Sequence, residues 1–224
     1  MSNFISKSSN LKKQDSTKII TDTIKNQILN DNTHLLPFYY SVCSFGFYDN
    51  YGNKLPPSTI RKYWDRGEVD KTCILIRNML KEHLQMDQVY CFPERHRPEI
   101  DINGDVVKEG RFHINVLMSS IPDDAVENPN RRCRRLFYEN GRMNIPINQL
   151  VYSDDLDDLK IDLINACLRK ADWINKFSGS VKTQLLYDSI DVDNVIEYCL
   201  KDFINHKVDF TDVICFKASD FYKP

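Results

Sequence analysis

Five stretches of the chain alternate apolar and polar positions, or carry the aromatic and β-branched residues that β-strands favour. They are residues 38–47, 88–94, 112–118, 181–187 and 209–216. Asn103-Gly104 stands between the second and third stretches and is a strong hairpin signal. We therefore expect those two strands to pair antiparallel.

Apolar residues recur at helical spacing between these stretches. We expect helices at residues 58–84, 154–176 and from 192 or 193 to 205, and a short amphipathic helix at 21–32. Ser58 suits the N-cap of the first long helix, and Gly67 is a position where that helix could divide. The resulting order is β, α, β, β, α, β, α, β, which predicts an α+β fold with a central antiparallel sheet flanked by helices.

The composition suits a single domain with one appendage. Residues 1–20 are rich in Ser, Asn and Lys and are predicted to be a disordered tail. Residues 21–224 are predicted to form one domain, with a loop insertion around 122–148 that holds prolines, asparagines and arginines. Hydrophobic residues make up 42 % of the 224, which is enough for a substantial core.

The net charge of −2 excludes a polycation that coats duplex DNA without sequence preference. A nucleic-acid site would have to be local. The candidates are Arg95-His96-Arg97 and the cluster of Arg131, Arg132, Arg134 and Arg135. The alternative is that these charges only solvate the surface.

The seven cysteines are odd in number, and no two have the CxxC spacing of a metal knuckle. We expect reduced thiols that act as small core residues.

Residues 1–15 lack the apolar core of a secretory signal, and no apolar run is long enough to cross a membrane. These features predict a cytoplasmic protein without a membrane partner.

Tyr198 and Lys201 are three residues apart in a predicted helix and therefore share a face. A tyrosine can attack phosphorus if it is activated, and an ammonium group nearby can offset charge on a phosphate. Such pairs also occur by chance on many helices. On its own the spacing is weak evidence, and a surface tyrosine packed on a lysine side chain is the more common explanation.

His113 and Asn115 are two residues apart on a predicted strand and therefore project from one face. An imidazole and an amide oxygen can both bind a divalent cation, with a carboxylate as the usual third partner. Glu94 closes the preceding strand and is placed to supply it. The alternative is a partly exposed His-Asn pair on an edge strand.

With these motifs in this order, the chain resembles the HUH-type rolling-circle replication initiators of plasmids and single-stranded DNA viruses. Three segments carry the resemblance: Phe38-Tyr39-Tyr40-Ser41-Val42, His113-Ile114-Asn115 and Tyr198-Cys199-Leu200-Lys201. It covers roughly residues 38 to 205. It implies an RNA-recognition-motif-like sandwich that nicks and joins single-stranded origin DNA with Mg²⁺ or Mn²⁺.

The resemblance also implies roles for individual residues. Tyr198 would be the nucleophile and Lys201 its helper, while Glu94, His113 and Asn115 would hold the metal, with Glu109 and His96 as competitors for the acidic position. Asn115 stands where the family usually has a second His, which implies weaker metal binding. DNA contacts are expected from Arg95, Arg97 and Arg111.

A single tyrosine implies that a homodimer, or a water activated by Asp193 or Glu197, completes the cycle. The chain has no Gly-x-x-x-x-Gly-Lys-Ser/Thr loop, so unwinding would need a separate helicase. Two alternatives stay open: a relaxase or single-tyrosine transposase with the same chemistry, and a non-catalytic DNA-binding regulator on the same fold.

Overall fold

The computed structural model describes only part of the chain, and everything below refers to that part. It comprises residues 22, 25, 26, 28, 37–46, 48, 49, 51–56, 58, 59, 66–96, 99–108, 111–139, 154–170 and 179–204. Within it, helices pack on a four-stranded antiparallel sheet, which confirms the predicted α+β class.

The sheet is built from β1 (Phe38–Phe45), β2 (Val89–His96), β5 (Arg111–Ser119) and β6 (Ser180–Leu186). Its spatial order is β2-β5-β1-β6, and each neighbouring pair is antiparallel. The two central strands, β5 and β1, therefore come from distant parts of the sequence. Each strand lies close to a stretch that the sequence pattern predicts.

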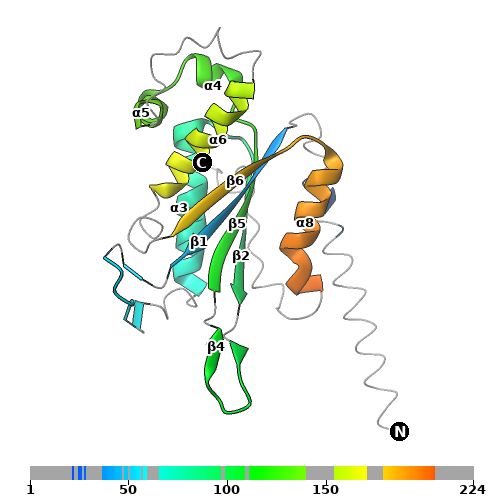
Figure 1. The fold of residues 1–224 in the computed structure, drawn as a ribbon. Helices are drawn as coiled ribbons and strands as arrows, with labels where there is room; N and C mark the ends of the chain where they lie inside the picture. The colour runs from blue at the N-terminus through cyan, green and yellow to red at the C-terminus, as the bar shows by residue number, and fades with distance from the viewer. Residues whose placement is uncertain are drawn as a thin grey trace.

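Helices cover both faces of this sheet. On one side lie α3 (Arg66–Leu84) and α6 (Asp154–Arg169), together with the shorter α4 (Asp123–Glu127) and α5 (Arg131–Glu139). Figure 1 shows α8 (Ser189–Ile204) on the opposite side. Along the chain, the four strands of this sheet and the long helices follow in the order β1, α3, β2, β5, α6, β6 and α8.

Strand alternation divides the apolar side chains between two cores. In β1, Tyr39 and Cys43 belong to the core that packs against α3 and α6. Phe38 and Tyr40 point the other way and join the core beneath α8. The strand is buried on both sides, as expected for a central strand between two helical layers.

The expectation of a loop at 122–148 is wrong for residues 123–127 and 131–139, which form α4 and α5. The physical reason lies at Asn130, whose side-chain oxygen accepts hydrogen bonds of 2.9 Å from the backbone N–H groups of Arg132 and Cys133. This N-cap starts α5, and burial of Leu136 and Phe137 anchors it.

The Asn103-Gly104 hairpin forms as predicted. It joins the short strands β3 (Glu99–Ile100) and β4 (Val106–Lys108), which pair antiparallel. Gly104 has φ of 89°, a conformation in which a Cβ atom would be strained. Figure 1 shows this hairpin extending beyond the end of β2 and β5.

Helix α8 begins at Ser189, three residues or more before the predicted start. The side chain of Asp188 accepts a hydrogen bond of 2.8 Å from the backbone N–H of Asp191 and so caps the helix.

At the other end of the chain, Asp22, Lys25, Asn26 and Ile28 are helical, in agreement with the short helix predicted at 21–32.

Several expectations lie outside the described residues: the tail at 1–20, residues 171–176 of the third helix, and the strand at 209–216. Residues 58, 59 and 66–84 are helical, but the segment between them also lies outside the described residues, so a break near Gly67 stays untested.

Six cysteines are described; all are free thiols and five are buried, in line with their predicted core role. Among the described helices, none has the length and apolarity needed to cross a membrane.

Candidate functional site

Strand pairing brings Glu94, His113 and Asn115 together on the face of the sheet that α8 covers. In the register of β2 and β5, Glu94 lies opposite His113 and Phe92 lies opposite Asn115. His113 Nε2 is 2.6 Å from Glu94 Oε2, and Asn115 Nδ2 donates to the same oxygen at 3.0 Å. The three residue types predicted as a cation site therefore form one connected cluster.

Helix α8 adds Lys201 and Tyr198 to this cluster. Its buried stripe of Val192, Ile196 and Leu200 packs on the sheet and fixes the orientation of the helix. The Lys201 Nζ atom forms an ion pair of 2.5 Å with Glu94 Oε1. The same Nζ lies 3.7 Å from the centre of the Tyr198 ring.

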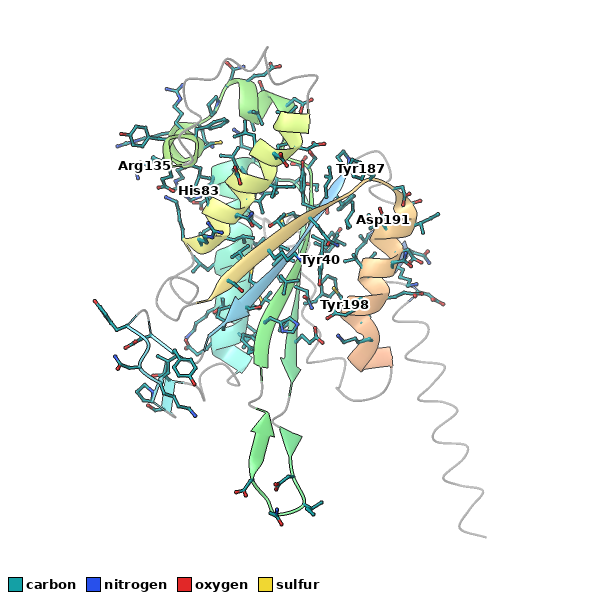
Figure 2. The ribbon with its side chains drawn as sticks, in the orientation of Figure 1. Tyr40, His83, Arg135, Tyr187, Asp191 and Tyr198 are labelled. Carbon is teal, nitrogen blue, oxygen red and sulfur yellow. The ribbon has the colours of Figure 1, made fainter. Side chains whose placement is uncertain are left out.

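Lys201 is thus the physical link between the strands and the tyrosine. Tyr198 is 46 % exposed, so part of its side chain is open to solvent. The predicted sharing of a helix face by Tyr198 and Lys201 is confirmed. Figure 2 shows Tyr198 and Tyr40 on the α8 side of the sheet.

Glu94 is 7 % exposed, yet it stays ionised. Burial alone would raise its pKa, but hydrogen bonds from His113, Lys201 and Asn115 outweigh burial and lower the pKa to about 2. Burial likewise opposes the charge on Lys201, and its contacts with Glu94 and Tyr198 outweigh burial and raise the lysine pKa above its ordinary value. The site therefore holds a carboxylate and an ammonium near neutral pH.

Tyr40 is part of the site, although the sequence analysis placed it only in the strand segment Phe38-Tyr39-Tyr40-Ser41-Val42. Its hydroxyl donates a hydrogen bond of 2.8 Å to Asn115 Oδ1. Burial raises the pKa of Tyr40 far above that of a free phenol, so it remains protonated. No local sequence signal points to this contact, because it joins residues on two strands that are 75 positions apart.

The fit of this cluster to a divalent cation rests on a carboxylate, an imidazole and an amide that meet at one point. Mg²⁺ and Mn²⁺ accept such donors. Over the residues that the structure describes, no three His, Cys, Asp or Glu side chains gather into a cation site. A cation here would therefore depend on Glu94 and His113, with Asn115 as the third candidate.

The two acidic residues that were candidates to activate a water are held elsewhere. Lys25 forms ion pairs with Glu197 at 2.6 Å and with Asp193 at 3.0 Å. Both carboxylates therefore serve to join the N-terminal helical segment to α8. This contact disfavours their assignment as general bases for Tyr198 chemistry.

The predicted DNA-binding arginines are only partly described. The backbones of Arg95 and Arg111 lie in β2 and β5, near Glu94 and His113 respectively. Arg97 and the competing ligand Glu109 are outside the described residues, and for His96 only the backbone position in β2 is described.

The arginine cluster at 131–135 lies on α5, and all four of its arginines are exposed. Arg132 forms an ion pair with Glu82, and the Arg134 side chain donates to the carbonyl of Pro129. Helix α5 belongs to the layer opposite α8, and Figure 2 shows Arg135 on that side, away from Tyr198. The arginine surface of α5 is thus separate from the cluster of Glu94, His113, Asn115, Lys201 and Tyr198.

No protein-family model, curated protein or solved structure matches the chain.

Proposed function

We propose that this chain cuts and rejoins single-stranded DNA, with Tyr198 as the nucleophile. The observation that carries the proposal is the contact of Lys201 with both Glu94 and the Tyr198 ring. This contact places an exposed tyrosine beside a cluster of a carboxylate, an imidazole and an amide, which are residue types that bind phosphate-activating cations.

The connectivity of the sheet supports the same proposal. The order β-α-β-β-α-β, with strand order β2-β5-β1-β6, is that of a split βαβ sandwich. An RNA-recognition-motif-like HUH nuclease would use this arrangement with the α8 side of the sheet facing its substrate. Here α8 delivers the tyrosine to that face, and His113 and Asn115 project from a central strand.

In the proposed reaction, the Tyr198 oxygen attacks a backbone phosphorus while the bond from phosphorus to the 3′ oxygen breaks. The products are a 5′-phosphotyrosine and a free 3′-hydroxyl; the tyrosine proton passes to solvent, and the departing 3′ oxygen takes a proton from solvent. Attack by a 3′-hydroxyl on the phosphotyrosine reverses the step and joins strands without ATP. The phosphodiester energy is kept in the protein–DNA bond.

Each remaining residue has a role that its position supports. Lys201 offsets the charge that develops on the phosphate oxygens, because its ammonium lies beside the tyrosine ring. A Mg²⁺ or Mn²⁺ ion held by Glu94 and His113 would polarise the phosphate when bound. Arg131 and Arg135 of α5 are exposed and suited to contacts with DNA phosphates outside the cut site.

Initiation of rolling-circle replication at an origin follows from this chemistry as the biological role that we infer. A second protomer and a separate helicase belong to the same proposal. A relaxase or single-tyrosine transposase would use the same residues. A non-catalytic DNA-binding regulator is the second candidate, because Asn115 points its amide nitrogen, and not its oxygen, toward Glu94.

The decisive experiment is a search for a covalent adduct. The purified protein is incubated with Mn²⁺ and a labelled library of random single-stranded oligonucleotides, and adducts that survive SDS are isolated. We expect an adduct for the wild type and none for Tyr198→Phe. The matched control is Tyr187→Phe, which alters another exposed tyrosine, 69 % accessible, next to β6.

Peptide mapping of the adduct identifies the attacked residue. An adduct that persists in Tyr198→Phe contradicts the nucleophile assignment. DNA binding without any adduct in any variant favours the regulator.

A further inference from the structure

Helix α5 is divided sharply into a buried side and an exposed side. Cys133, Leu136 and Phe137 are buried in the core that α5 shares with α3 and α6. The other six positions are exposed: Arg131, Arg132, Arg134, Arg135, Tyr138 and Glu139. Positions three and four apart are neighbours on a helix, so these residues form one continuous surface, the exposed side of α5.

The two edges of the exposed side are neutralised by neighbouring helices. Arg132 forms an ion pair with Glu82 of α3. Glu139 accepts an ion pair of 2.7 Å from Lys170, which directly follows α6. These contacts fix the helix on the layer beneath it and use up the charges at its margins.

The centre of the exposed side carries charge without a counter-charge. Among the described residues, no carboxylate pairs with Arg131, Arg134 or Arg135. Arg134 Nε donates to the carbonyl of Pro129 at 2.9 Å, which holds the side chain but leaves its charge unbalanced. Like charges three and four positions apart on a helix repel each other, and an anion bound between them would remove that repulsion.

An exposed aromatic ring lies among these arginines. Tyr138 is 74 % exposed, and it follows Arg134 and Arg135 by four and three positions, so it shares their side of the helix. A ring for stacking bases, flanked by cations for phosphates, is the combination with which proteins hold single-stranded nucleic acid. The bases of a duplex are already stacked on each other, so the ring favours a single strand.

We propose that the exposed side of α5 binds a segment of single-stranded DNA, with phosphates on Arg131, Arg134 and Arg135 and a base stacked on Tyr138. The segment lies away from Tyr198, because α5 and α8 pack on opposite sides of the sheet (Figure 1). This binding needs no reaction at Tyr198. Only the choice of DNA as the polymer rests on the proposed function.

The test measures the affinity for a fluorescent oligo-dT of about 16 nucleotides by anisotropy, in EDTA so that no divalent cation supports the proposed reaction. We expect Tyr138→Ala to weaken binding about fivefold or more, the loss typical of one stacked base. Tyr138→Phe should stay within about twofold of the wild type, because the ring stacks without its hydroxyl. Tyr51→Ala is the matched control, since Tyr51 is 90 % exposed on the turn at 49–53, which contains no arginine.

Salt dependence separates stacking from charge. Tyr138→Ala should leave the slope of log affinity against log salt unchanged, whereas Arg131→Ala should lower it by about 0.7, the value of one phosphate contact on a single strand. With a duplex of the same length, Tyr138→Ala should change the affinity by less than about twofold, because a duplex offers no free base.

Photocrosslinking locates the contact. An oligo-dT that carries 5-iododeoxyuridine is irradiated on the protein, and we expect the crosslinked peptide to contain Tyr138. An unchanged single-strand affinity of Tyr138→Ala overturns the inference. Losses that are equal in Tyr138→Phe, in Tyr51→Ala or on the duplex overturn it as well, as does a wild-type protein that binds no oligo-dT.

The proposed function is judged by a separate readout. The expected losses without a covalent adduct in any variant support the α5 surface and contradict the nuclease. Adduct formation with an unchanged affinity of Tyr138→Ala supports the nuclease and contradicts the surface. Tighter binding of oligo-U than of oligo-dT, with the same dependence on Tyr138, overturns DNA as the polymer.

Discussion

At the scale of residues, Glu94 is the centre of the candidate site. One of its oxygens accepts hydrogen bonds from His113 and Asn115, and the other is paired with Lys201. Placing a carboxylate at 7 % exposure costs free energy unless such partners compensate. The exposed Tyr198 lies beside this buried carboxylate. Buried charged groups next to an exposed reactive side chain are typical of a functional site.

The low pKa of Glu94 predicts a loss of stability in acid. Its folded pKa of about 2 lies below the ordinary value of 4.5, so the ionised carboxylate stabilises the native state above pH 4.5. This contribution, on the order of 3 kcal/mol, should disappear as the pH falls from about 4.5 to about 2. Urea unfolding of wild type and Glu94→Gln at pH 7 and pH 3 measures it.

We expect the difference in unfolding free energy between these two proteins to be smaller at pH 3 than at pH 7. A difference that does not change with pH would mean that the carboxylate is not preferentially ionised in the native state.

Lys201 should affect the rate of cleavage more than the binding of DNA, because the charge it offsets develops in the transition state. We expect Lys201→Ala to reduce the single-turnover rate by about a hundredfold, with a much smaller loss of single-strand affinity. Lys71→Ala, an exposed lysine of α3, is the control. Equal losses of rate and affinity would indicate a simple phosphate contact.

At the scale of elements, α8 connects stability with the position of Tyr198. Its buried residues repeat at intervals of four, at Val192, Ile196 and Leu200, and the exposed Tyr198 lies between them. The ion pairs of Lys25 with Asp193 and Glu197 hold the N-terminal helical segment against the same helix. The orientation of the tyrosine thus depends on packing that is distant in sequence.

Ile196→Ala tests this dependence. Ile196 is fully buried, so its truncation should lower the free energy of unfolding by about 2–4 kcal/mol through lost burial and the cavity left behind. Asn194→Ala, at an exposed position of the same helix, should cost much less. Chemical denaturation of both variants provides the comparison, and equal stabilities would show that α8 is not packed on the sheet.

At the scale of the whole molecule, the two faces of the sheet carry different side chains and helices. The α8 side carries the candidate chemistry, and the opposite layer carries α5 with its exposed arginines. The chain as a whole is slightly acidic, with a net charge of −2, so this basic surface is a local exception. Arg131 and Arg135 are four residues apart and share one side of the helix.

If α5 contacts DNA phosphates, reversing these charges should weaken binding and its salt dependence. We expect the double variant Arg131→Glu, Arg135→Glu to lower the slope of log affinity against log salt by about 1.4 to 1.8, equivalent to two lost phosphate contacts. Fluorescence anisotropy over a salt series measures the slope. Lys71→Glu serves as the charge-reversal control, and an unchanged slope in the arginine variant would assign these charges to solvation.

The sequence by itself determined the described strands of the sheet, most helical segments, the hairpin at Asn103-Gly104, and the shared faces of Tyr198 with Lys201 and of His113 with Asn115. These features follow from periodicities of two and 3.6 residues and from turn chemistry, which are local properties. The helix α5 was missed, although Asn130 and the buried Cys133, Leu136 and Phe137 carry its signal, because the prolines and arginines around them suggested a loop.

The antiparallel pairing of the strands that carry Glu94 and His113 was expected from the Asn103-Gly104 turn, and the register of β2 and β5 confirms it. Only the tertiary structure decided that packing of α8 brings Lys201 to the same carboxylate and that Tyr40 reaches Asn115 from a third strand. Such contacts depend on three-dimensional packing between segments far apart in the chain, and no local pattern encodes them.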